Sequence, residues 1–242
     1  MFDKPIDYIA LVVFVLATYF FIVSMAKLGR IRDAGILKEE IMKRQKDLGI
    51  RVFDIFDFEK YSFSDLEKLN EKLKDFMNLK NKYSDYQTVP AAIIEKSITN
   101  YDKVVIINSG EVDGIRVNMP VISEDGLVGY IIEVNKKTSK VQLITDTAST
   151  VSGNISTAES SILLKGQLDK NDTIKASYIP TEATVLQGDE VYTSGIGGIY
   201  PKGILIGKIK DVINTKNESD RYANVETSVN FNKLVNVLVI VN

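Results

Sequence analysis

The sequence predicts a mainly β protein in which a transmembrane helix and a coiled-coil stalk precede two small β-barrels. Residues 8–26 contain no charged side chain, whereas residues 27–88 are rich in charge and contain no Pro. The rest of the chain has short runs of Val, Ile and Thr separated by turn residues. These patterns are typical of a membrane span, amphipathic helices and β-strands, in that order.

The apolar stretch is long enough to cross a membrane. As a helix, residues 8–26 would span about 28 Å, close to the hydrocarbon thickness of a bilayer. Two alternatives are a cleaved signal peptide and a buried core helix, but Ser24-Met25-Ala26 is followed at once by Lys27 and makes a poor cleavage site. We therefore expect an uncleaved anchor behind a seven-residue head, residues 1–7.

The flanking charges give only a weak orientation. The head carries Lys4 and two Asp residues, while Lys27, Arg30 and Arg32 follow the span. Taken alone, the positive-inside rule weakly favours a cytoplasmic location for the long C-terminal part.

Composition excludes several kinds of chemistry. The chain has 242 residues, a net charge of −2, no Cys and no His. A broad basic surface for nucleic acid is therefore not expected. Disulfides, Cys or His nucleophile systems and His-containing zinc sites are excluded. We expect no cofactor and no metal site.

The stalk, residues 27–88, contains a heptad pattern. Five side chains follow the a/d spacing of a coiled-coil seam: Leu66, Leu69, Leu73, Phe76 and Tyr83. We predict a helix over 64–86 that begins at a capping box of Ser64 and Glu67. An earlier helix is expected around Ala34, Leu37, Ile41 and Leu48.

Two arrangements of the stalk remain open. It could pair with a second copy as a parallel homodimer, or it could pack as an amphipathic helix on its own chain. Residues 49–58, with Gly49 and alternating Phe and Asp, interrupt the heptads and argue against one continuous coil.

The β region, residues 89–242, is predicted to form two related barrels that divide near residue 148, and insertion of one barrel in the other is left open. Twelve strands are expected: 91–95, 103–108, 120–123, 127–135, 140–144, 150–155, 162–165, 174–179, 190–193, 204–212, 224–229 and 236–241.

An internal similarity links the two halves of this region. Residues 127–134 align without a gap with residues 205–212, and each segment has Gly at its third position. Gly inside a strand marks a bulge or a tight bend. We expect structural roles for five glycines: Gly126, Gly129, Gly195, Gly203 and Gly207.

A Gly-rich segment, residues 193–203, does not fit a phosphate loop, because Pro201 and another β run follow it instead of a helix. Ser194 could act as a nucleophile with Lys202 or Lys208 as base, but no second polar motif supports catalysis. We interpret the segment as a tight loop that presents Tyr200 and Pro201 to a partner.

The β region also resembles a known family. The matching segments are 91–94, 106–110 with 114–115, 119–122, 126–129, 141–146, 188–195, and 200–204 with 206–207. Thr193-Ser194-Gly195 followed by Tyr200-Pro201-Lys202-Gly203 is the most specific of them. With the anchor and the heptads, they make the chain similar to the bacterial rod-shape-determining MreC family.

The resemblance implies a single-pass protein whose residues 27–242 are extracytoplasmic, which overrides the charge bias. It also implies a non-enzymatic scaffold that dimerises through its stalk and supports cell-shape maintenance. The implied partners are MreD, RodA and a transpeptidase (a penicillin-binding protein), with MreB contacted indirectly. An anchored hydrolase and a periplasmic efflux adaptor are the alternatives, although an adaptor would normally interrupt its β region with a helical hairpin.

Overall fold

The computed structural model describes seven stretches of the chain: residue 29 and residues 32–47, 62–98, 102–158, 161–168, 173–213 and 221–241. The predicted head and transmembrane segment lie outside these stretches. Among the residues that are described, no helix combines the length and the apolar character needed to cross a membrane.

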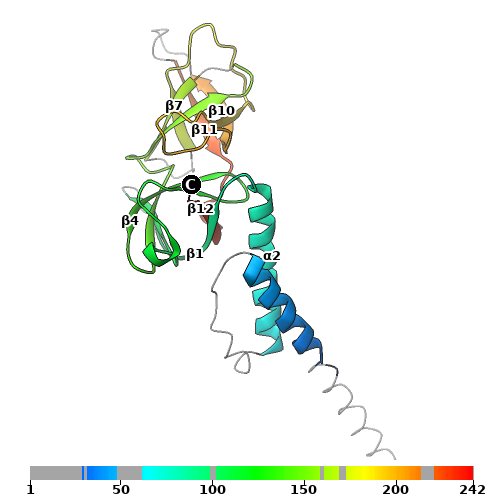
Figure 1. Ribbon diagram of the computed structural model, residues 1–242. Coiled ribbons are helices and arrows are strands. Elements are labelled where there is room, and N and C mark those ends of the chain that lie inside the picture. Colours follow the sequence, from blue (N-terminus) through cyan, green and yellow to red (C-terminus); the bar gives the residue numbers. More distant parts are fainter. Residues whose placement is uncertain are drawn as a thin grey trace, which may run out of the picture. The chain divides into compact units, whose positions relative to one another are not determined.

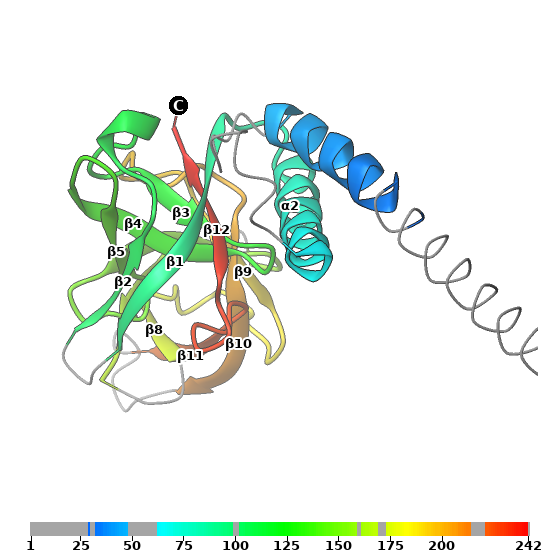
Figure 2. The same cartoon turned by 90° about the horizontal axis from the view of Figure 1, so that it is seen from below.

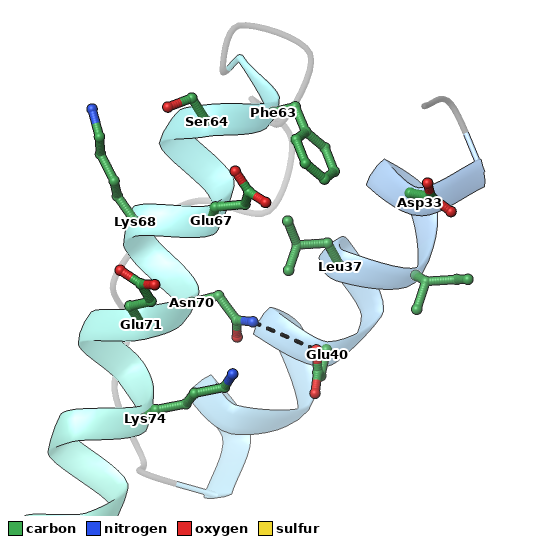
Figure 3. Close-up of a pocket in the computed structure, with 11 residues that line it drawn as sticks. Asp33, Leu37, Glu40, Phe63, Ser64, Glu67, Lys68, Asn70, Glu71 and Lys74 are labelled. Atoms are coloured by element: carbon green, nitrogen blue, oxygen red, sulfur yellow. Dashed lines mark hydrogen bonds between the residues drawn. The ribbon is translucent and has the colours of Figure 1, made fainter. Parts of the chain in front are cut away.

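The chain divides into two compact units, residues 1–77 and 78–242. In the first unit, a helix covering residues 32–47 packs against the N-terminal part of α2 (Phe63–Lys82). The two helices run in the same direction (Figure 3). Their shared core contains Ile41, Leu66 and Leu73, surrounded by half-buried Leu37 and Leu69.

Helix α2 begins at Phe63, and its N-cap residue lies two residues earlier than the sequence pattern predicts. The Asp65 backbone N–H donates to Ser62 Oγ at 3.3 Å, and Asp65 Oδ2 accepts the Ser62 backbone N–H at 3.2 Å. These reciprocal bonds form the capping box, so the predicted pair Ser64 and Glu67 is wrong. The hydrogen bonds from Ser62 also lower the pKa of Asp65, which keeps a carboxylate at the positive end of the helix.

The second unit contains two closed barrels, which Figures 1 and 2 show from two directions. The first barrel has the strand order β1-β12-β3-β4-β5-β2. Its strands are β1 (Thr88–Ile98), β2 (Lys103–Ile107), β3 (Pro120–Ile122), β4 (Leu127–Val134), β5 (Ser139–Leu143) and β12 (Asn236–Ile240), with a 3-10 turn, η2 (Glu111–Asp113), between β2 and β3.

The second barrel has the order β10-β11-β8-β7-β6-β9. Its strands are β6 (Thr150–Ile155), β7 (Ser161–Gly166), β8 (Thr173–Ser177), β9 (Glu190–Thr193), β10 (Leu205–Ile213) and β11 (Tyr222–Thr227). All six lie between β5 and β12 in the sequence, so the second barrel is an insertion into the first.

The alternation of buried and exposed residues explains why these segments form barrel walls. In β7, for example, Ile162, Leu164 and Gly166 are buried while the residues between them are exposed. The inward side chains of each barrel form an aliphatic core, mostly Val, Ile and Leu. β-Branched side chains suit a pleated, half-buried surface, which favours strands over helices in this part of the chain.

The internal similarity in the sequence corresponds to equivalent strands. β4 pairs with β3 and β5, and β10 pairs in the same way with β9 and β11. Each strand has Gly at its third residue, and a register shift follows shortly afterwards, between Ile131 and Glu133 in β4 and between Ile209 and Asp211 in β10. Each of the twelve predicted strands overlaps an observed one. Mainly β structure with two barrels is therefore confirmed.

Candidate interaction surfaces

The heptad seam of α2 is covered within the chain. Leu66 and Leu73 are almost fully buried, and their cluster includes Ile41 from the helix of residues 32–47. Leu69 and Phe76 pack against the same cluster and are half-buried. In the single chain, α2 thus packs as an amphipathic helix on its own chain, one of the two arrangements left open by the sequence. The homodimer stays a prediction.

A polar network fixes how the two helices align. Arg44 donates to the side-chain carbonyl of Asn70 and, at 2.7 Å, to Glu40 Oε1. The Asn70 amide lies 3.5 Å from the second Glu40 oxygen, as the dashed line in Figure 3 shows. Asn70 is buried, so leaving its amide without these partners would cost stability. Sequence reasoning missed this network because Glu40 and Arg44 lie outside the heptad segment.

Beside this network, an open cleft of about 570 Å³ lies between the two helices on one side of the pair (Figure 3). Its lining mixes apolar Ile36, Leu37 and Phe63 with charged Glu67 and Lys74, among others. Ile36 and Phe63 are exposed. The helix pair is therefore packed on one side and open on the other.

Tyr83, the last predicted stalk residue, lies beyond the end of α2 in a turn. Its side chain is half-buried, and this burial, with the nearby Asp125 carboxylate, raises the pKa of the Tyr83 hydroxyl. The seam observed in the helix pair ends before this residue, since Phe76 and Met77 are its last members.

Two of the predicted glycines allow adjacent strands to approach closely. A Cβ atom at Gly129 would lie 1.9 Å from the carbonyl oxygen of Gln142, and one at Gly207 would lie 2.1 Å from that of Glu226. Both distances are far below any normal contact. Only Gly fits at these positions in β4 and β10.

The remaining predicted glycines lie in turns with positive φ. Gly126 (φ 144°) also lies against the second barrel, because its Cβ would meet the Leu205 carbonyl oxygen at 2.3 Å. Gly195 (φ 83°) and Gly203 (φ 92°) bound the loop between β9 and β10. Their left-handed backbone strongly favours Gly over any residue with a Cβ.

Ser194 is engaged in hydrogen bonds that hold this loop on β6. Its hydroxyl donates to Ser152 Oγ at 2.9 Å and accepts the backbone N–H of Ile196 at 3.1 Å. Its own N–H donates to the Ser152 carbonyl at 3.0 Å. A serine nucleophile needs a base at its hydroxyl. In the described part of the chain, the neighbour at that position is Ser152, not a lysine ammonium group.

Tyr200 is buried instead of presented to a partner, which corrects the prediction for this residue. Its side chain is 6% exposed, and burial raises the pKa of its hydroxyl. The ring of Tyr200 meets that of Tyr130 edge to face, with centroids 6.3 Å apart. Pro201 is half-buried, and its carbonyl accepts a hydrogen bond from the Thr193 hydroxyl. The loop exposes the apolar side chain of Ile196, at 63%, and the side chain of Lys202.

The Tyr130–Tyr200 contact belongs to a junction between the barrels. Tyr130 donates to Gln142 at 2.7 Å, and Gln142 donates to the buried carboxylate of Asp146 at 2.9 Å. Asp146 also accepts the backbone N–H of Lys103 at 2.7 Å. These bonds satisfy a carboxylate whose burial would otherwise be costly. They hold the connection from β5 to β6, where the chain passes between barrels.

The most unusual exposed side chain on the second barrel is Tyr178. It is 75% exposed and has a φ of 61°, a conformation that is rare for a bulky residue. The loop that follows is held by Arg221, which donates to the carbonyls of Pro180 at 3.2 Å and Ala183 at 2.8 Å. The sequence gives no signal for this surface, because a Tyr at the end of a strand usually indicates a core position.

Comparisons with known proteins agree with this architecture. The family model "rod shape-determining protein MreC, barrel core" matches residues 93–241. The cell shape-determining protein MreC of Bacillus subtilis is 32% identical over 73% of this chain and 64% of its own length. That of Listeria monocytogenes is 30% identical over 62% of this chain and 52% of its own length. The chain thus spans between half and two thirds of these relatives.

Solved structures of MreC proteins are also similar to this chain in fold. A Listeria MreC structure has a TM-score of 0.59 and 27% identity, and the match covers 73% of this chain and 86% of that one. The complex between penicillin-binding protein PBP2 and MreC from Helicobacter pylori contains a chain with a TM-score of 0.51 and 16% identity, covering 64% of this chain and 99% of that one. The second likeness is one of fold alone.

Proposed function

The chain belongs to the MreC family of rod shape-determining proteins, and on that premise we propose that it is a membrane-anchored, extracytoplasmic scaffold for cell-wall synthesis. The observation that carries the proposal is the match of the family's barrel core to residues 93–241, which include nearly all of both barrels. The relatives are cell shape-determining proteins, and their name gives this chain its proposed role in maintaining cell shape.

The anchor in this proposal is the uncharged stretch of residues 8–26. Its length suits a single crossing of the bilayer. Residues 27–242 are then extracytoplasmic, with residues 1–7 on the cytoplasmic side. An anchor confines the barrels to a layer near the membrane surface, where membrane-bound wall enzymes are present at high effective concentration.

The partner in this proposal is a transpeptidase of the penicillin-binding class. The Helicobacter pylori relative forms a complex with PBP2, which supports a partner of the same class here. MreD and RodA are proposed as further partners within the membrane, with MreB linked through them. A second copy of the chain is proposed to pair through α2.

Closure of the barrels restricts how such a partner can bind. In a closed barrel each wall strand has two neighbours, so a partner cannot add a strand to a free edge. Faces and loops are the available surfaces, and we propose the loop at Tyr178 as the contact, since Tyr is enriched among the few side chains that carry most of the binding energy at interfaces.

The alternative of a Ser194 hydrolase is less well supported. Its nucleophile would need a lysine at the hydroxyl, where Ser152 is found. The efflux-adaptor alternative requires a helical hairpin within the β domain, whereas the described residues between β1 and β12 contain only strands, turns and the short η2. A scaffold needs neither feature.

Replacement of the chromosomal copy tests the proposed function. Ser194→Ala should support normal cell width, because a scaffold needs no nucleophile. A chain that lacks residues 8–26 but is exported by a cleavable signal should fail to support it, because the tether is lost. Loss of shape with Ser194→Ala at normal protein level, or full function of the untethered chain, would contradict the proposal.

A further inference from the structure

The seam of α2 has two possible occupants, and the structure shows one of them. In the single chain, residues 32–47 cover Leu66 and Leu73 with Ile41. In the homodimer proposed above, a second α2 would need the same residues for a parallel coiled coil. One face of a helix cannot do both, so the two contacts exclude one another.

The covering helix, residues 32–47, has features that would allow a second copy of α2 to displace it. It leaves an open cleft of about 570 Å³ beside the seam, lined by exposed Ile36 and Phe63. The side-chain amide nitrogen of buried Gln45 has no hydrogen-bond partner among the described residues. Gly35 lies inside the covering helix and weakens it.

A second α2 matches the seam at least as well. The covering helix places Leu37 and Ile41 in the shared cluster, whereas α2 offers Leu66, Leu69, Leu73 and Phe76. The covering helix already runs in the same direction as α2, so the seam accepts a parallel neighbour (Figure 3). A parallel second copy would meet identical a/d layers along the helix.

We propose that residues 32–47 act as an intramolecular cap on the dimerisation seam, and that the chain dimerises by exchanging this cap for the α2 helix of a second copy. The inference rests on the proposed homodimer. It adds that dimerisation competes with the cap, so the strength of the cap sets the concentration at which dimers form.

A cross-link across the helix pair tests the exchange directly. The chain contains no Cys, so thiols can be placed at chosen positions. Glu40→Cys with Asn70→Cys puts two thiols where the parent side chains lie 3.5 Å apart. A short thiol-specific cross-linker then closes the cap in the full chain in detergent. Glu39→Cys with Lys43→Cys is the matched control, since it cross-links two exposed positions on one helix.

Sedimentation measures the dimer before and after cross-linking. The closed cap should raise the dimer dissociation constant by about tenfold or more, while the control cross-link should leave it unchanged. A closed-cap chain that dimerises as strongly as the same variant before cross-linking would overturn the exchange but not the homodimer. A parent chain that stays monomeric at every concentration would overturn the homodimer itself, and the exchange with it.

A second variant should change the dimer dissociation constant in the opposite direction. Ile41→Ala removes the buried side chain of the cap and leaves α2 intact, so the capped monomer is weakened and the dissociation constant should fall by about tenfold or more. Ile36→Ala, at an exposed position of the same helix, should change it little. If Ile41→Ala instead weakens the dimer, residues 32–47 are part of the dimer interface and the proposal is wrong.

Discussion

Replacing Gly129 by Ala should destabilise the two-barrel unit far more than a typical surface substitution. A Cβ at this position would lie 1.9 Å from the Gln142 carbonyl oxygen and 3.1 Å from the Leu143 Cα atom. Both belong to β5, the partner strand of β4. The added methyl group therefore meets backbone, which cannot rotate away as a side chain could.

The size of this destabilisation follows from the distance by which β4 and β5 must move apart. To reach a contact of 3 Å, the two strands must separate by about 1 Å, which overpacks the barrel wall at a cost of about 1–3 kcal/mol. The backbone hydrogen bonds on either side lengthen, and each contributes about 1 kcal/mol. We expect a loss of about 3–5 kcal/mol in the free energy of unfolding. For a unit of this size, that loss lowers Tm by about 6–20 °C.

Urea unfolding of residues 78–242, followed by circular dichroism, measures this effect. Gly188→Ala is the matched control, because Gly188 has a φ of 93° but open space around its Cβ position. The control should lose only the cost of a left-handed backbone, about 1–2 kcal/mol. Equal losses for the two variants would refute the argument from close strand contact.

Three further outcomes are expected. Leu73→Lys places a charge in the buried seam and should reduce both the helical signal of the stalk and dimer formation; unchanged sedimentation of the full chain would contradict this. Ser62→Ala removes the N-cap side chain of α2 and should cost about 1 kcal/mol of helix stability in thermal unfolding. Ser64→Ala, at the position predicted from the sequence for the N-cap, should cost little. Burial raises the pKa of Tyr200, so the folded state holds this proton more tightly than the unfolded state, and stability should fall as pH rises above about 10, the ordinary tyrosine value. Tyr200→Phe should flatten this alkaline loss in urea titrations at pH 9 to 11, with Tyr178→Phe as the exposed-tyrosine control; equal slopes for the parent and Tyr200→Phe would contradict this reasoning.

Local sequence patterns predicted the strands well because most of them alternate between core and solvent, as β2, β5, β6 and β7 do. They also located Gly129 and Gly207, since a Gly inside an apolar strand has few explanations other than close backbone contact. The equivalence of β4 and β10 followed from the same two residues and their neighbours. These features depend on nearest neighbours in the chain and in the sheet.

Features that depend on distant parts of the chain were not predictable. Tyr200 lies in a Gly-rich loop, which suggests exposure, but its ring is buried beside Tyr130 at the junction of the barrels. The Glu40–Arg44–Asn70 network joins residues 26 to 30 positions apart. Both Ser62 and Ser64 are followed three residues later by an acidic residue, so the sequence pattern alone could not identify Ser62 as the N-cap residue of α2. Only the three-dimensional structure distinguishes these cases.

The proposed scaffold depends above all on direct binding of a wall-synthesising enzyme by the barrels. Photo-cross-linking in intact cells tests it, with a photoreactive amino acid placed at Tyr178 and, as a control, at Val112, an exposed apolar position in η2 of the first barrel. We predict an adduct between position 178 and a penicillin-binding transpeptidase that is absent or much weaker from position 112. Adducts from position 178 that contain no wall-synthesising enzyme, in cells of normal shape, would contradict the claim.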